Sequence, residues 1–270
     1  MSSGCKLIAI VSAVVLDLFD PDVLRDAKQS ALEYALISKP FTYNRMRLPI
    51  RRCVENIAKG KFAESLVVSV LKRGGLAIDV DSCETPFWSR DRRDFVLGGH
   101  EWDVKSIYLH RLPPNRRFDD CLALIPNKSS RDQWATRETR YVPTALAGPC
   151  YMFVFLSPMS VEIELDDHQE KYLSALCARY REVESRSEPF DEDWFFSEFP
   201  NFEQVSMAIS TNPILAITGV AGSKDWDCFA PCPPGPVIVD GVQVFHTAIE
   251  NMACRAGDLP QFVDVANWTP

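Results

Sequence analysis

The chain has 270 residues, of which 46% are hydrophobic, and this is enough for one large domain with a sizeable core. Its net charge of −8 argues against a uniformly basic nucleic-acid-binding protein. The charges are unevenly distributed, because residues 41–140 hold 19 Lys/Arg and 13 Asp/Glu, whereas the rest of the chain holds 10 and 24. This asymmetry suggests a polyanion-binding face on an acidic protein, although ordinary solvated surface charge gives the same pattern.

The N-terminal region, residues 1–50, is predicted to be a helical extension, with a helix start where Asp20 can cap and Pro21 suits the first turn. The apolar run at 7–19 contains Asp17 and is shorter than the roughly 18–20 residues that a membrane span needs, so it predicts a buried helix or strand. Nine scattered cysteines and the lack of a convincing signal peptide indicate reduced thiols and a cytoplasmic protein.

The next segments alternate between helix and strand. Residues 38–52 form a basic connector in this interpretation, and residues 54–75 have the apolar spacing of a long helix that ends at Gly74 and Gly75. Residues 76–80 are predicted to form a short strand. A hairpin is expected at 94–109, after a loop.

The second half of the chain contains further strands and an acidic insertion. The apolar run at 151–158 predicts a buried central strand, and residues 214–222 and 236–247 predict more strands, separated by a proline-rich loop. Residues 161–205 hold 13 Asp/Glu against 4 Lys/Arg and are expected to form an exposed helix and loop. The order of these elements predicts a single mixed α/β domain over 1–270.

The hairpin brings acidic residues together. With the turn at Gly98 and Gly99, counting outward pairs Leu97 with His100, Val96 with Glu101, Phe95 with Trp102 and, finally, Asp94 with Asp103. Alternation then puts Lys105 on the same face as Asp103. Two facing carboxylates are destabilising unless one is protonated or a divalent cation binds both, and Mg²⁺ suits such oxygen ligands.

This pattern resembles the PD-(D/E)XK nuclease signature, the core of many restriction endonucleases. Asp94 is followed after eight residues by Asp103-Val104-Lys105, with Arg93 where the family often has proline. The family usually has an acidic residue on a preceding helix, and Glu64 is expected at that place.

The resemblance implies a restriction-endonuclease-like fold, in which a mixed central sheet is flanked by helices, and a Mg²⁺-dependent endonuclease that hydrolyses DNA. It covers 54–160 as the catalytic core and, loosely, 210–265 as the C-terminal strands. A type II restriction enzyme is the first choice of role, and a homodimer is expected by analogy, since palindromic sites match two-fold symmetry. By the same resemblance, Lys105 would position or activate the attacking water, and four residues would hold the metal: Asp94, Asp103, Glu64 and the carbonyl of Val104.

A cluster of basic residues with one tryptophan follows the hairpin. Arginine and lysine supply phosphate contacts, and an aromatic ring can stack on an unpaired base. The predicted DNA contacts are Arg111, Arg116, Arg117, Lys128, Arg131, Trp134, Arg137 and Arg140.

Several alternatives stay open at this point. The hairpin can be an ordinary surface feature with salt-bridged aspartates. The chain can be a repair- or phage-type nuclease directed at particular DNA structures, single strands or RNA, or a non-catalytic DNA-binding module on the same fold. An iron–sulfur cluster is a further alternative, although the spacing favours free thiols. Its ligands would be Cys53, Cys228, Cys232 and Cys254.

Overall fold

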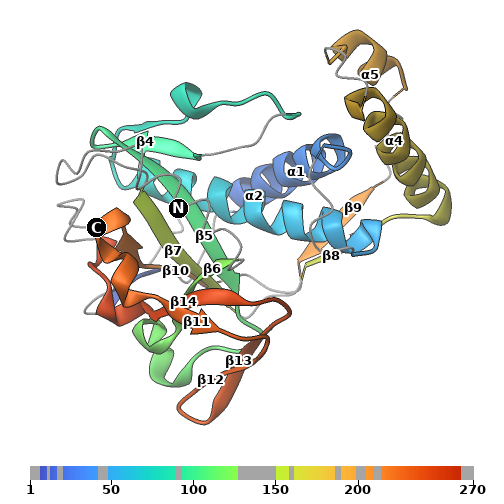
Figure 1. Ribbon diagram of the computed structural model, residues 1–270. Coiled ribbons are helices and arrows are strands. Elements are labelled where there is room, and N and C mark those ends of the chain that lie inside the picture. Colours follow the sequence, from blue (N-terminus) through green and yellow to red (C-terminus); the bar gives the residue numbers. More distant parts are fainter. Residues whose placement is uncertain are drawn as a thin grey trace.

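The computed structural model describes ten stretches of the chain, and a mixed seven-stranded sheet runs through them (Figure 1). The described residues are 7–10, 13–16, 21–41, 48–88, 93–126, 150–157, 161–185, 190–198, 205–209 and 214–262. The order across the sheet is β1-β2-β10-β7-β5-β4-β3. These strands are β1 Leu7–Ile10, β2 Ala13–Leu16, β3 Ile78–Asp79, β4 Phe95–Leu97, β5 His100–Tyr108, β7 Cys150–Ser157 and β10 Ile214–Ala221. β5 and β7 are parallel, and every other neighbouring pair in the sheet is antiparallel.

Two helices cover one face of the sheet. α1, Pro21–Ser38, packs on α2, Ile50–Arg73, and α2 in turn packs on β5. Residues Ala58, Phe62 and Leu66 of α2 are fully buried, and their four-residue spacing puts them on one side of the helix. The helix predicted over 54–75 is therefore confirmed, and it begins inside the segment that the sequence suggested as a basic connector.

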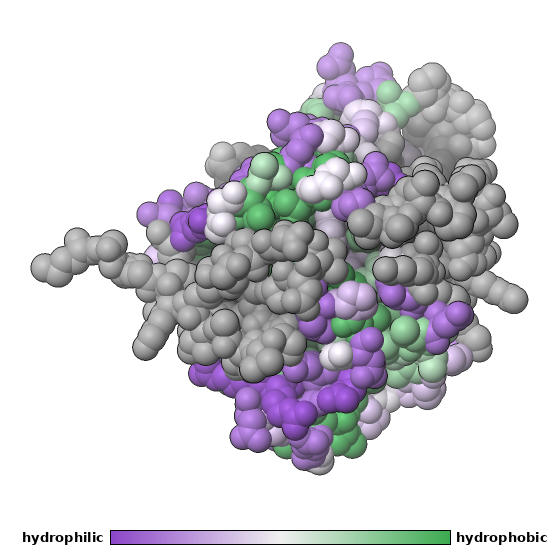
Figure 2. All heavy atoms as spheres, turned by 90° about the vertical axis from the view of Figure 1, so that its left-hand side faces the viewer, coloured by the Kyte–Doolittle hydropathy of each residue, from purple (hydrophilic) through white to green (hydrophobic). Residues whose placement is uncertain are grey.

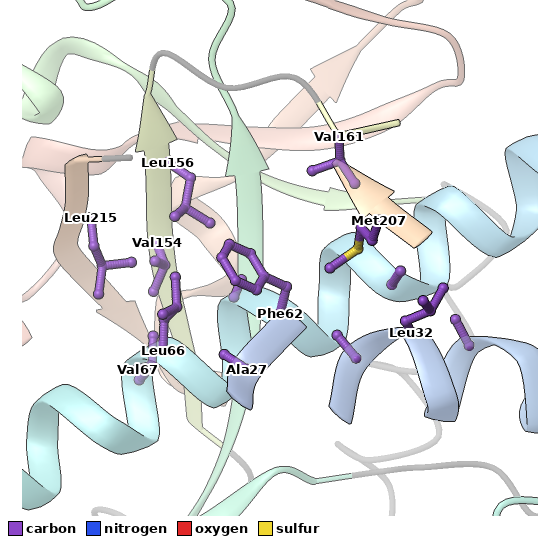
Figure 3. Close-up of a cluster of buried hydrophobic side chains, with 14 of the residues drawn as sticks. Ala27, Leu32, Phe62, Leu66, Val67, Val154, Leu156, Val161, Met207 and Leu215 are labelled. Atoms are coloured by element: carbon purple, nitrogen blue, oxygen red, sulfur yellow. The ribbon is translucent and has the colours of Figure 1, made fainter. Parts of the chain in front are cut away.

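The buried strand predicted at 151–158 is confirmed as β7, and every one of its residues is buried. Because side chains alternate along a strand, β7 contributes to two cores. On the helical face, Val154 and Leu156 lie close to Phe62 of α2 (Figure 3). On the other face, Tyr151, Phe153 and Phe155 pack against the C-terminal layer.

The C-terminal layer consists of small antiparallel sheets. β6, Leu122–Pro126, joins β14, Asn251–Arg255, and β11, Ala230–Cys232, while β12, Gly235–Val239, pairs with β13, Val242–Thr247. The segment predicted as a proline-rich loop contains β11 and a short 3-10 helix, Ser223–Cys228. Pro231 is accommodated in β11 because this strand lies at an edge of its sheet.

The acidic insertion is more ordered than the sequence suggested. Its ends pair as β8, Val161–Glu164, and β9, Ser206–Ile209, and it carries α4, Asp167–Ser185, and α5, Glu192–Glu198. Both helices project from the sheet in Figure 1. Aromatic rings fasten α5 to the rest of the molecule, since Phe195 lies 5.1 Å from Phe41 and 5.5 Å from Phe87, between ring centroids.

The prediction of a helical N-terminal extension is wrong for its first part. Residues 7–10 and 13–16 form an antiparallel pair, and β2 pairs with β10. The run is short and rich in β-branched residues, which favour strands over helices. Pairing with the distant strand β10 is therefore more stable than a helix would be. None of the helices in the described stretches combines the length and the apolar character that crossing a bilayer requires.

Candidate active site

The hairpin has the register that the two glycines predict. Gly98 and Gly99 have φ values of 62° and 77°, which only a type I′ turn uses at both central positions and which glycine adopts without strain. The pairs Phe95–Trp102, Val96–Glu101 and Leu97–His100 follow. The ladder ends at the pair of Phe95 and Trp102 and Asp94 lies in the bend just before β4, so the predicted pairing of Asp94 with Asp103 is not part of the observed register.

Asp94 forms hydrogen bonds to β5 through both its backbone and its side chain. Its N–H donates a hydrogen bond to the carbonyl of Trp102 at 2.8 Å, and its Oδ2 accepts one from the N–H of Val104 at 2.5 Å. In an antiparallel strand, the N–H and C=O of one residue point to the same neighbour, so the carbonyl of Val104 faces the side on which Asp94 lies. The carboxylate of Asp94 is therefore held beside an oxygen of the main chain.

Asp103 and Lys105 lie together on one face of β5, as alternation predicts. The Nζ of Lys105 is 2.7 Å from Oδ1 and 2.6 Å from Oδ2 of Asp103, and it lies 5.0 Å from the ring centroid of Tyr151. The two charged side chains are 15% and 23% exposed, respectively. Burial disfavours the ammonium, but Asp103 and Tyr151 favour it more strongly, so the pKa of Lys105 is raised.

Asp94 is electrostatically unfavourable when it is ionised. Burial raises its pKa well above the ordinary value, and the nearby carboxylates of Glu64 and Asp103 raise it further, whereas Lys61 and the N–H of Val104 act in the opposite direction. Glu64, on α2, is 2.7 Å from the Nζ of Lys61. The charges of Glu64 on α2 and Asp103 on β5 therefore both act on Asp94, which lies in the bend before β4.

A cleft of about 930 Å³ opens beside these residues, and Asp94, Glu64 and Lys61 line it. The loop of residues 80–88 and the helix α5 form its other walls. Sequence reasoning missed Lys61 and this cleft. The signal for Lys61 was available, since a lysine three residues before Glu64 lies on the same side of a helix.

The residues fit a divalent cation in their chemistry, because the carboxylate of Asp94 has a raised pKa beside the carboxylates of Glu64 and Asp103, and Lys61 offsets this effect only in part. Asp94, Asp103 and the carbonyl of Val104 would be the candidate ligands on the hairpin, with Glu64 on the side of the helix. Within the described stretches, no group of three or more His, Cys, Asp or Glu side chains is arranged so that it could hold a metal ion. A cation would therefore have to draw Asp103 away from Lys105 or bind beside their ion pair.

The described part of the predicted DNA contacts lies at the other end of β5. Arg111, Arg116 and Arg117 follow Tyr108, and with a rise of about 3.3 Å per residue Tyr108 is roughly 17 Å along the strand from Asp103. Arg117 forms an ion pair with Asp120 at 2.8 Å. The segment that follows β5 (green in Figure 1) lies in the lower part of the molecule, and hydrophilic residues cover much of the described lower surface in Figure 2. The other predicted contacts, Lys128, Arg131, Trp134, Arg137 and Arg140, lie outside the described residues.

Among the residues that the structure describes, the cysteines do not assemble as a cluster would require. Burial and then Cys53 are among the causes that raise the pKa of Cys177 on α4, whereas burial and then Cys228 raise the pKa of Cys254 in the C-terminal layer. All described cysteines are free thiols. The iron–sulfur alternative is therefore not supported by the arrangement of these residues.

Compared with protein-family models, with curated proteins and with solved structures, the chain shows no significant match. The fold is thus defined by its own topology as a mixed α/β domain with a mixed central sheet.

Proposed function

We propose that this protein is a Mg²⁺-dependent nuclease that hydrolyses phosphodiester bonds in DNA, with a restriction-endonuclease-like core. The observation that carries the proposal is the meeting of Asp94, Asp103 and Lys105 at one end of a hairpin, with Glu64 close by. The sheet topology supports it as well, because the strand that carries Asp103 and Lys105 has the parallel strand β7 as its neighbour in the sheet.

Each residue has a distinct role in this proposal. Asp94, Asp103 and the carbonyl of Val104 would hold the metal, and Glu64 would complete the acidic site. A bound Mg²⁺ would supply Lewis-acid stabilisation of the charge on the phosphoryl group.

Lys105 would contribute the second positive charge. Its pKa is raised, so it carries a proton at neutral pH and acts as a cation and hydrogen-bond donor. It would orient the attacking water and stabilise the negative charge that develops on the phosphate. Tyr151 and Asp103 hold the ammonium in place for this role.

Purified protein incubated with DNA, with and without Mg²⁺, tests the proposal. We expect cutting that needs Mg²⁺ and that Asp103→Asn and Lys105→Met each reduce at least about a hundredfold. Ile238→Ala serves as the control, because this exposed side chain of β12 lies outside the site. Cutting that survives both site variants would come from another source, and binding without cutting in several metals would indicate a non-catalytic module.

A further inference from the structure

Resting on the proposed nuclease function, we propose that the cleft beside Asp94 takes an unpaired nucleic-acid strand, with bases stacked on its aromatic wall. The cleft is the space into which both Asp94 and Glu64 open. Asp103 and Lys105 do not line the cleft, so a strand in it would approach the site from the side of Asp94 and Glu64.

The size of the cleft favours a single strand. Its volume of about 930 Å³ lies in the range of sites that enclose one small molecule or a few linked units. A B-form duplex, whose major groove alone is about 12 Å wide, is much larger than such a space. The walls come from α1, α2, the loop of residues 80–88 and α5, so they enclose the acids on several sides.

One wall of the cleft is aromatic and held firmly. Phe196 is 49% exposed and lines the cleft with Phe87 and Trp88. Its ring lies 5.6 Å from that of Phe87, and Trp88 stacks on Phe190 at 4.6 Å between centroids. Exposed rings that are supported from behind form a platform on which bases of any sequence can stack.

The opposite wall supplies a cation close to the acids. The Nζ of Lys61 lies 4.7 Å from the ring centroid of Tyr34 and 2.7 Å from Glu64, and all three residues line the cleft. This lysine is placed to contact a phosphate between the aromatic wall and Asp94.

The charge of the cleft argues against a duplex as well. Among the described residues, five acidic and two basic ones line it, whereas a surface for duplex DNA presents many cations to the two phosphate backbones. Base stacking must therefore provide most of the affinity, and the metal must offset part of the negative charge. The acidic residues are Glu64, Asp81, Glu84, Asp94 and Glu192, and the basic ones are Lys61 and Arg93.

A preference for unpaired strands favours a repair- or phage-type role over that of a type II restriction enzyme, which must bind duplex sites. The preference is measured with one oligonucleotide, offered single-stranded and as a duplex in the presence of Mg²⁺. We expect the single strand to be cut at least about ten times faster. Phe196→Ala should raise KM for the single strand about tenfold, because one stacking surface is lost.

Matched variants separate stacking from a change in folding. Phe196→Tyr keeps the ring and should retain the wild-type KM, and Ile238→Ala, which truncates the other large exposed hydrophobic side chain among the described residues, should leave it unchanged. Equal or faster cutting of the duplex, or an unchanged KM in Phe196→Ala, would overturn the inference while the nuclease proposal stands. Failure to cut either substrate in any divalent metal would remove both.

Discussion

The carboxylate of Asp94 accepts a hydrogen bond from the backbone N–H of Val104, with 2.5 Å between Oδ2 and the nitrogen. Val104 lies between Asp103 and Lys105, so this single bond sets the position of Asp94 relative to both proposed partners. The arrangement holds an ionisable group where burial, Glu64 and Asp103 all oppose its negative charge. The ionised carboxylate therefore lowers the stability of the metal-free fold, and a bound cation would remove this cost.

Asp94→Asn should abolish cutting without reducing stability. The amide oxygen can still accept the hydrogen bond from Val104, while repulsion from Glu64 and Asp103 disappears. We expect the free energy of unfolding in urea at neutral pH to stay unchanged or to rise by about 1 kcal/mol. Asp79→Asn is the control, because hydrogen bonds from Ser82 lower the pKa of that exposed aspartate and its charge is favourable. A clear loss of stability in Asp94→Asn alone would contradict the electrostatic interpretation.

The stability of the metal-free protein should depend on the ionisation of Asp94. Its pKa is raised in the folded state, so the folded protein binds this proton more tightly than the unfolded chain does. The contribution to stability is present below the ordinary aspartate pKa of 3.8 and is lost as the pH rises through the raised value. The melting temperature of the wild type relative to Asp94→Asn, measured against pH, should therefore fall as the pH increases over this window.

Added Mg²⁺ should reverse this trend. Ionised Asp94 binds the cation and protonated Asp94 does not, so the rise in melting temperature caused by Mg²⁺ should be larger at neutral than at acidic pH. Asp94→Asn should show little of this rise. An equal rise in both proteins would place the cation elsewhere.

Lys105 and Asp103 should be strongly coupled in stability. Lys105→Met leaves a mostly buried carboxylate without its cation and should cost about 2 kcal/mol. In Asp103→Asn/Lys105→Met the isolated charge is absent, so the double variant should be more stable than the sum of the single changes predicts, by about 1 kcal/mol. Urea denaturation of the four proteins gives this coupling, and strictly additive effects would show that the ion pair is not a unit.

Alanine substitutions at two glycines should change the stability of the protein in opposite directions. A Cβ at Gly219 on β10 would lie 2.6 Å from the carbonyl oxygen of Ala256 and 2.8 Å from the Cβ of Leu259, so Gly219→Ala should destabilise the protein by about 1–3 kcal/mol. Gly60 lies inside α2 with nothing within 4 Å of its added Cβ, and Gly60→Ala should stabilise by roughly 0.5–1 kcal/mol. Thermal or urea unfolding of the two variants distinguishes them, and a stable Gly219→Ala would show that the C-terminal layer can move away.

Local chemistry explains why parts of the site could be predicted. A two-glycine turn and period-two alternation determine which residues oppose each other in the hairpin, and so the sequence alone placed Asp103 beside Lys105. The helix that carries Glu64 and the buried strand β7 follow equally from apolar spacing over short stretches.

Contacts between segments that are distant in the sequence could not be predicted from such local patterns. The sequence did not reveal that residues 13–16 pair with β10, that Lys61 reaches the acids, or that Arg111, Arg116 and Arg117 lie at the far end of β5. Nor did it reveal the cleft, whose walls come from segments as far apart as Tyr34 and Phe196. The physical reason is that turn geometry and side-chain periodicity are properties of neighbouring residues, whereas the position of one element against another depends on how all their side chains pack in three dimensions.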